Sequence, residues 1–137
     1  MEPIKTAEME DKKAKLSTLW IFVLFNYLYC DVLALFDPAT IKDVLAGQMG
    51  GFQSSQGLLL GSAILMEIPI AMLLLSRVLK HGANRWANII AGAIMTAVQA
   101  ASLFTGTAPT PYYAFFSAIE IACTALIVWL AWKWRVS

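Results

Sequence analysis

The sequence has very little of the chemistry that depends on nitrogen or sulfur ligands. Its 137 residues include one histidine, His81, and two cysteines, Cys30 and Cys123, which form no C-x-x-C motif. A Ser-His-Asp triad, a Cys-His pair, a haem site or a Glu-x-x-His di-iron site needs histidine in the folded core. A zinc site would lack nitrogen ligands, and no lysine lies in the core of an apolar stretch, where it could form a Schiff base. We therefore expect no metal and no cofactor.

Charged residues are also scarce. They make up 14% of the chain, against 59% hydrophobic and 12% aromatic residues. This is the composition of a membrane protein rather than a soluble one. Because there is no glycine-rich phosphate loop and no nucleic-acid-binding patch, no nucleic acid is expected as a partner. The expected partner is the lipid bilayer.

Four apolar stretches reach or approach the roughly 20 residues needed to cross a bilayer core about 30 Å thick. They cover residues 16–36, 57–79, 86–104 and 112–134. The expected fold is all-α, a four-helix transmembrane bundle over residues 16–137 that follows a charged cytoplasmic tail, residues 1–15. The first stretch is not expected to be a cleaved signal, because a charged tail precedes it and no small-residue cleavage site follows.

The basic residues predict the orientation. Nine of the ten lysines and arginines lie in the tail, around the second connection or at the C-terminus, and the third connection has none. By the positive-inside rule, both termini are cytoplasmic in a multi-pass protein of the inner (plasma) membrane. Aromatic rings should then mark the two interfaces: Trp20, Trp86, Trp132 and Trp134 on the inner side, Tyr112 and Tyr113 on the outer side.

The first connection and the small residues predict local packing. Asp37-Pro38 is a helix N-cap followed by a favoured first position, and Gly47 ends the segment, so a short helix should lie on the outer interface.

Small residues at Gly57-x-x-x-Gly61, Ala91-Gly92 and Ala118-x-x-x-Ala122 let helices approach closely. They do not distinguish contacts within the chain from a homo-oligomer.

Acidic residues inside the apolar stretches are the main functional signal. Asp31, Glu67 and Glu120 all fall within predicted spans, where an acid at a helix centre costs roughly 2.5–3.5 kcal/mol. Counted from the outer ends, they lie in the outer half or at the midplane. Asn26, Gln99 and Tyr27 lie at similar depths. We therefore expect a polar cavity that opens to the outer face.

No basic residue lies in any span core, so these acids are either protonated or bound to a cation. Pro69, two residues after Glu67, removes a backbone donor and clashes with the carbonyl of Leu65, which predicts a helix kink beside Glu67. Structural hydrogen bonding by protonated Glu67 or Glu120 is the alternative to a binding site.

The favoured function is the binding or translocation of a small amphiphilic or cationic molecule, coupled to protons. In this hypothesis Glu67 and Glu120 exchange the proton, Asp31 attracts cations, and Asn26, Gln99 and Tyr27 orient the ligand. One alternative is an intramembrane acid/base enzyme, such as an isomerase, acting on a lipophilic substrate. Another is a non-catalytic subunit of a membrane redox complex. The residues leave open whether the protein is an enzyme.

Four segments carry a resemblance to a known family. They are LSTLWIFVLFNYLYCDVLALFDP (16–38), LLLGSAILMEIPIAMLLLSRVL (58–79), ANRWANIIAGAIMTAVQ (83–99) and TPYYAFFSAIEIACTALIVWLAWKWR (110–135). They resemble small bacterial and archaeal four-span membrane proteins that form a domain of unknown function, loosely similar to the DoxX-like proteins. The resemblance implies a four-helix membrane fold. It does not point to any particular activity. The DoxX comparison points, by analogy of fold alone, to quinone-linked redox subunits.

Overall fold

The computed structural model describes residues 3–49, 52–104 and 109–134. The fold is all-α, as predicted. The helices are α1 (Pro3–Ala34), α2 (Pro38–Leu45), α3 (Gln56–Val78), α4 (His81–Ser102) and α5 (Pro111–Lys133). A short antiparallel pair, β1 (Gln48–Met49) and β2 (Phe52–Gln53), joins α2 to α3.

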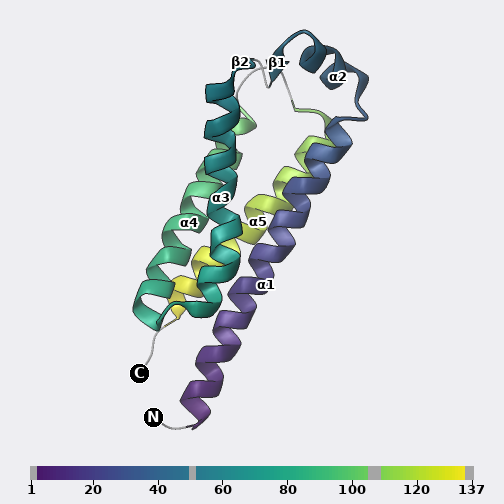
Figure 1. Cartoon of the computed structure of the whole chain (residues 1–137). Coiled ribbons are helices and arrows are strands. Elements are labelled where there is room, and N and C mark those ends of the chain that lie inside the picture. Colours follow the sequence, from purple (N-terminus) through teal and green to yellow (C-terminus); the bar gives the residue numbers. More distant parts are fainter. Residues whose placement is uncertain (1–2, 50–51, 105–108, 135–137) are drawn as a thin grey trace.

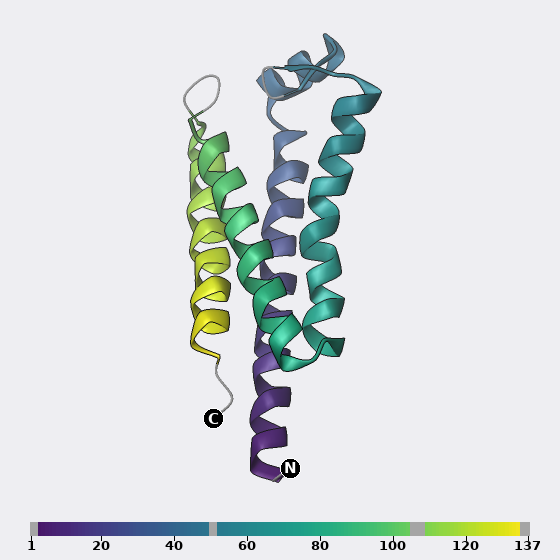
Figure 2. The same cartoon turned by 90° about the vertical axis from the view of Figure 1, so that its left-hand side faces the viewer.

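The four long helices, α1, α3, α4 and α5, lie side by side (Figure 1). Helix α1 packs against α3 on one side and α5 on the other, while α4 packs mainly on α5 and less extensively on α3. The core lies where they meet; its buried residues include Leu16, Trp20, Val23, Met72, Met95 and Ile127. Helix α1 begins beyond the ends of its neighbours, and α2 with the β pair lies at the opposite end (Figure 2).

Among the described residues, three helices are long and apolar enough to cross a membrane: Thr6–Ala34, Gln56–Val78 and Pro111–Lys133. Helix α4 has 22 residues and similar length, but it is not one of the three. Its first two turns carry polar side chains, including Asn84, Arg85 and Asn88, which lower its mean hydropathy. The three helices are consistent with a membrane protein, and the predicted fourth span over residues 86–104 stays a prediction.

The charged N-terminal segment is part of α1. The sequence predicts a charged tail over residues 1–15 ahead of the first span, and its described part, from Pro3 on, forms the first turns of a helix that runs without interruption to Ala34. Two ion pairs one helical turn apart lie in this segment: Lys13 Nζ is 3.6 Å from Glu10, and Lys15 Nζ is 3.1 Å from Asp11. Such pairs stabilise an exposed helix by a few tenths of a kcal/mol, about 0.2–0.5 each.

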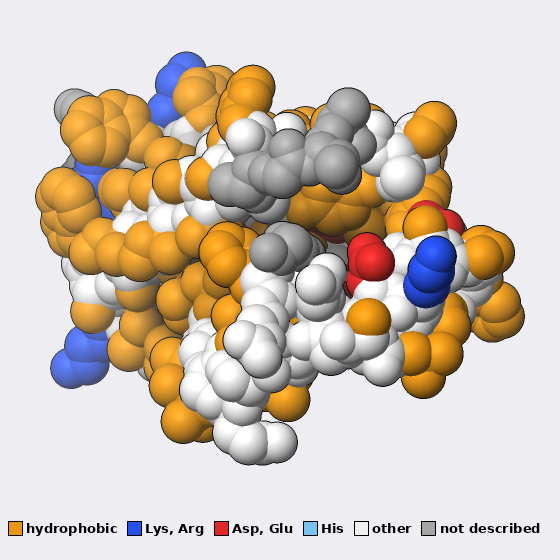
Figure 3. Space-filling view, turned by 90° about the horizontal axis from the view of Figure 1, so that it is seen from above, with side chains coloured by type: hydrophobic (Ala, Val, Ile, Leu, Met, Phe, Trp, Pro, Cys, Tyr) orange, Lys and Arg blue, Asp and Glu red, His pale blue; other side chains and the backbone are white. Residues whose placement is uncertain are grey.

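Helix α2 forms where the sequence predicts it. The Asp37 carboxylate caps the helix by accepting a hydrogen bond from the Ala39 amide at 3.1 Å. The chain leaves the helix through Gly47, whose φ of +80° lies in the left-handed region that favours glycine. Tyr112, near the start of α5, donates to the other Asp37 oxygen at 3.3 Å. Seen from this end, charged side chains of both signs lie near hydrophobic ones (Figure 3).

Two of the tryptophans predicted to mark the inner interface are buried among the helices. Trp20 is 0% exposed and Trp134 is 4% exposed, whereas Trp86 and Trp132 are about half exposed. The Trp134 ring packs edge-on against His81, with the ring centroids 4.8 Å apart. The position of a tryptophan along a helix predicts its depth, but the helix face that carries it decides what it contacts.

Candidate functional site

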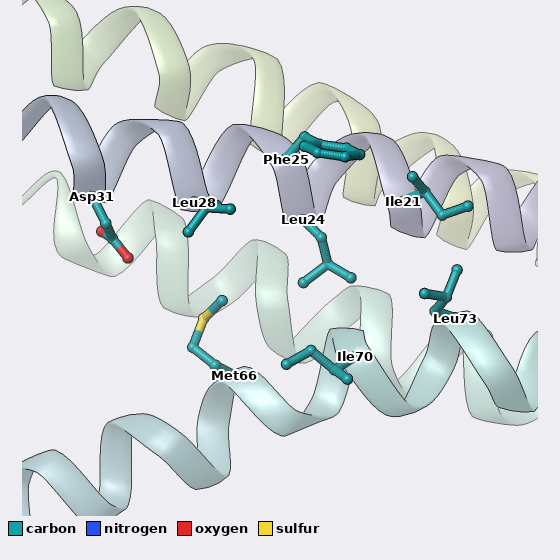
Figure 4. A pocket seen from close by; sticks show the side chains of 8 residues that line it. All are labelled: Ile21, Leu24, Phe25, Leu28, Asp31, Met66, Ile70 and Leu73. Atoms are coloured by element: carbon teal, nitrogen blue, oxygen red, sulfur yellow. The ribbon is translucent and has the colours of Figure 1, made fainter.

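A cavity of about 370 Å³ lies between α1 and α3. This volume is within the range typical of small-molecule sites, roughly 300–1,000 Å³. Eight side chains line it (Figure 4): Ile21, Leu24, Phe25, Leu28 and Asp31 from α1, and Met66, Ile70 and Leu73 from α3. The residues on α1 recur every three or four positions, so they form one stripe along the helix.

Asp31 is the one polar side chain among those lining residues, and it lies at one end of the row (Figure 4). The other seven are apolar. The cavity opens along the surface of the helix pair, since Phe25 and Leu28 are each 57% exposed. A ligand could therefore enter sideways from an apolar surrounding. No lysine or arginine lines the cavity, and neither described ion pair involves Asp31.

A second polar group lies deeper, between α1 and α5. Glu120 is 2% exposed and Tyr27 is 7% exposed. The Oε1 atom of Glu120 and the hydroxyl of Tyr27 are buried and have no hydrogen-bond partner among the described residues. The two groups are close enough to interact electrostatically, and Glu120 interacts in the same way with Asp31. Electrostatic interactions thus link three of the predicted site residues, Tyr27 and Asp31 on α1 and Glu120 on α5.

The structure does not bring Glu67 to this group. Glu67 is exposed and does not line the cavity. The reason is helical geometry: the buried residues of α3 include Met72 and Ser76, five and nine positions after Glu67. At 100° per residue these separations place Glu67 on roughly the opposite side of the helix. The expectation of one pocket shared by Glu67 and Glu120 does not fit this arrangement, and a binding role for Glu67 remains a prediction.

The remaining predicted site residues also lie away from the cavity. The Asn26 amide donates to the Phe22 carbonyl of its own helix at 2.9 Å. Gln99 donates to the Ser117 hydroxyl on α5 at 2.7 Å. Pro69 is buried within α3, which continues through it as one helix. The predicted kink beside Glu67 stays a prediction.

A comparison with models of known protein families identifies the family of this chain. The model of DUF6326, described as a family of unknown function, matches residues 4–137. The chain belongs to this family. No curated protein and no solved structure matches it. The predicted membership of a domain of unknown function is therefore confirmed, and function has to be argued from the structure of this DUF6326 chain.

A buried polar network that sequence reasoning missed joins α1, α3 and α4 of the DUF6326 chain. The Asn88 oxygen accepts from the Trp20 indole at 2.8 Å and from the Ser76 hydroxyl at 3.2 Å. The Asn88 amide donates to the backbone and side-chain oxygens of Asn84. Asn84 in turn donates to the Ser76 carbonyl at 2.8 Å. All four side chains are fully buried.

The signal for this network was present in the sequence: two asparagines four residues apart share a helix face. The predicted third span begins at residue 86 and leaves Asn84 out, whereas α4 begins at His81 and includes both asparagines. Every polar side-chain nitrogen of the two asparagines has a partner. The network therefore holds helices together and offers no unsatisfied group to a ligand.

Helices α4 and α5 are joined by a ladder of side-chain hydrogen bonds. Each of three pairs has a distance of 2.7 Å: Thr96 with Thr124, Gln99 with Ser117, and Ser102 with Tyr113. Below the ladder, Gly92 is buried against α5. The predicted close approach at Gly92 is thus a contact within the chain. Gly61, in contrast, has no atoms near the position of a Cβ.

Proposed function

We propose that this protein binds a small amphiphilic cation in the cavity between α1 and α3 and moves it across the membrane. The observation that carries the proposal is the placement of Asp31 at one end of an otherwise apolar cavity with no basic residue lining it. A carboxylate in apolar surroundings is costly unless a counter-charge pairs with it. A cationic ligand would supply that counter-charge.

The apolar lining supports an amphiphile rather than a bare ion. From Ile21 to Asp31 the stripe on α1 covers ten residues, about 15 Å of helix. An alkyl or aromatic portion of a ligand would lie along this stripe, while its cationic group would lie beside Asp31. Burial of apolar ligand surface contributes about 25 cal/mol per Å², so most of the affinity would come from the tail and the selectivity from the charge.

The proposal includes a four-span architecture in the inner (plasma) membrane, with both termini cytoplasmic and α2 on the outer interface. Three membrane-length helices support it, together with α4, which has similar length and lies alongside them. The positive-inside distribution of lysine and arginine supports the orientation. Translocation would require the cavity, which opens sideways, to exchange its ligand with both sides of the bilayer.

The orientation predicts the outcome of labelling introduced cysteines with a membrane-impermeant thiol reagent. The background should be a variant in which Cys30 and Cys123, both buried, are replaced by alanine. A cysteine at Gln53, in β2, should be labelled in intact cells, whereas one at Gly82, at the start of α4, should be labelled only after permeabilisation. Labelling of the Gly82 position in intact cells would contradict the orientation.

The binding site predicts a charge-selective ligand. Purified protein in nanodiscs should bind decyltrimethylammonium, and bind decyl sulfate, which has the same chain and the opposite charge, at least about tenfold more weakly. Asp31→Asn keeps the side-chain size but removes the charge, so it should reduce decyltrimethylammonium affinity about tenfold or more. Calorimetry or equilibrium dialysis against empty nanodiscs would measure both.

Glu67→Gln is the matched control, because it also removes a carboxylate charge from a long helix but lies outside the cavity. It should leave the affinity within about twofold of wild type. Equal binding of the two surfactants, or unchanged affinity in Asp31→Asn, would refute the proposed site. Loss of binding in Glu67→Gln alone would instead assign the cation site to Glu67.

A further inference from the structure

Glu120 is the acidic side chain that the structure encloses most completely. It is 2% exposed, and its Oε1 atom has no hydrogen-bond partner among the described residues. The neighbouring Tyr27 hydroxyl is also buried and without a partner there. Buried polar atoms in folded proteins almost always have partners, so two such atoms on facing helices indicate a site that holds something else.

The groups around Glu120 do not provide a positive charge. From α1 it interacts with Tyr27, Cys30 and Asp31, of which only Asp31 carries a charge when ionised. On α5 itself, the titratable neighbour one turn away is Cys123. The titratable or charged residues of α4, His81 and Arg85, lie at its other end and bond the carbonyls of Trp134, Ala131 and Trp132. An ionised Glu120 would therefore be an unpaired buried charge.

We propose that Glu120 is a proton-binding site, completed by the Tyr27 hydroxyl and one bridging water, and that it releases its proton when a cation binds at Asp31. The coupling rests on the proposed function, whereas the proton site itself does not. A neutral carboxyl group keeps Oε1 as an acceptor. A water molecule can donate to this atom and accept from Tyr27, so that both unpaired atoms are satisfied by one molecule.

The sign of the coupling follows from the charges. An ionised Asp31 repels a negative charge on Glu120, because the two carboxyl groups interact electrostatically and like charges disfavour each other's ionisation. A bound cation offsets the charge of Asp31 and removes this repulsion, so ionisation of Glu120 becomes less costly. By linkage, loss of the proton from Glu120 strengthens cation binding to the same extent. Cation uptake is then exchanged for a proton.

Glu67 does not fit this role. It lies on the exposed side of α3, where no described contact connects it to Tyr27, Glu120 or Asp31. The sequence alone assigned the exchangeable proton to both glutamates. The burial of Glu120 and the absence of a described partner for its Oε1 atom favour Glu120 as the residue that holds the exchangeable proton.

Infrared spectroscopy tests the proton site without any ligand. The spectrum of wild type minus that of Glu120→Gln, near neutral pH, should contain the C=O band of a protonated carboxylic acid. Tyr27→Phe should move this band to higher frequency, because it removes the anchor of the water that donates to Oε1. Glu67→Gln is the control and should leave the band unchanged. A difference spectrum with carboxylate bands alone, or a band that Tyr27→Phe does not move, would overturn the proposed site.

The pH dependence of cation binding tests the coupling. The affinity of wild type for decyltrimethylammonium should rise with pH, by up to about tenfold per pH unit where one proton is released per cation bound. Glu120→Gln has no proton to release, so its affinity should remain and should be independent of pH over the same range. A pH dependence that survives in Glu120→Gln would overturn the coupling.

The two proposals fail in different ways. If wild type binds the cation but shows no pH dependence, the coupling is wrong and the binding function stands. If wild type binds no cation, the proposed function fails and the coupling fails with it, while the infrared difference still decides whether Glu120 holds a proton.

Discussion

Replacing Asn88 with leucine is expected to lower the free energy of unfolding by about 2–4 kcal/mol. The Asn88 oxygen accepts from Trp20 on α1 and Ser76 on α3, and its amide donates twice to Asn84. Leucine would leave the Trp20 indole and the Asn84 side-chain oxygen buried without those partners. Thermal unfolding in a mild detergent, followed by circular dichroism, would measure the loss.

Asn26→Leu is the control for this prediction. The described hydrogen bond of the Asn26 amide goes to a carbonyl of its own helix, so its removal should change the free energy of unfolding by less than about 0.5 kcal/mol. Trp20→Phe removes the indole donor but retains an aromatic ring. Its loss of unfolding free energy should lie between those of Asn88→Leu and Asn26→Leu. Equal stability of Asn88→Leu and Asn26→Leu would show that the network does not hold the helices together.

Replacing Gly92 with leucine is expected to force α4 and α5 apart. Even the first carbon of a side chain at this position would lie 2.7 Å from Val128 Cγ2 and 3.2 Å from the Thr124 carbonyl oxygen. Overpacking of this kind costs typically about 1–3 kcal/mol and occasionally more. Because Thr124 also bonds Thr96, a displaced α5 would lose part of the hydrogen-bond ladder. We therefore expect a loss of unfolding free energy at the upper end of this range.

Gly61→Leu provides a matched comparison. Both changes put leucine in place of a helical glycine, which by itself favours the helix by up to about 1 kcal/mol. Apart from Gly61, its chain neighbours and the nearby backbone of its own helix, no described atom lies within 4 Å of the position that a Cβ would take at Gly61, so this variant should be as stable as wild type or more stable. The difference between the two variants isolates the packing of α4 on α5. Similar stabilities would mean that the helices do not approach closely at Gly92.

The described polar groups of the long helices are used in two ways, and groups bonded to one another occur at both ends. Near the start of α4, the polar side chains of Asn84 and Asn88 bond one another and their neighbours. Toward α2, Asp31 opens onto a cavity, and Glu120 and Tyr27 keep unpaired atoms. Satisfied groups stabilise the packing, whereas unsatisfied groups are available to a ligand or a proton. The functional proposals therefore rest on Asp31, Glu120 and Tyr27 and not on the hydrogen-bonded pairs between α4 and α5.

The sequence by itself determined the local structure. Long apolar runs predicted the helices to within a few residues at most boundaries, and Asp37-Pro38 with Gly47 predicted α2, because caps and left-handed glycines act on neighbouring residues alone. The family resemblance was also carried by local segments. The rarity of acids in apolar helices singled out Asp31, Glu67 and Glu120, of which Glu120 is enclosed and the other two are exposed.

Only the tertiary structure decided which polar residues meet. Counting residues from the outer end of each predicted span placed Glu67 and Glu120 at similar depths in the membrane. Depth does not say which way a side chain points around its helix. Packing of α1 between α3 and α5 put Tyr27 next to Glu120 and Asp31 at the edge of a cavity, and it turned Glu67 outward. It also enclosed Trp20, which the sequence alone assigned to an interface. The rotation of each helix about its axis depends on all the helices that pack against it. A single sequence does not show which helices these are.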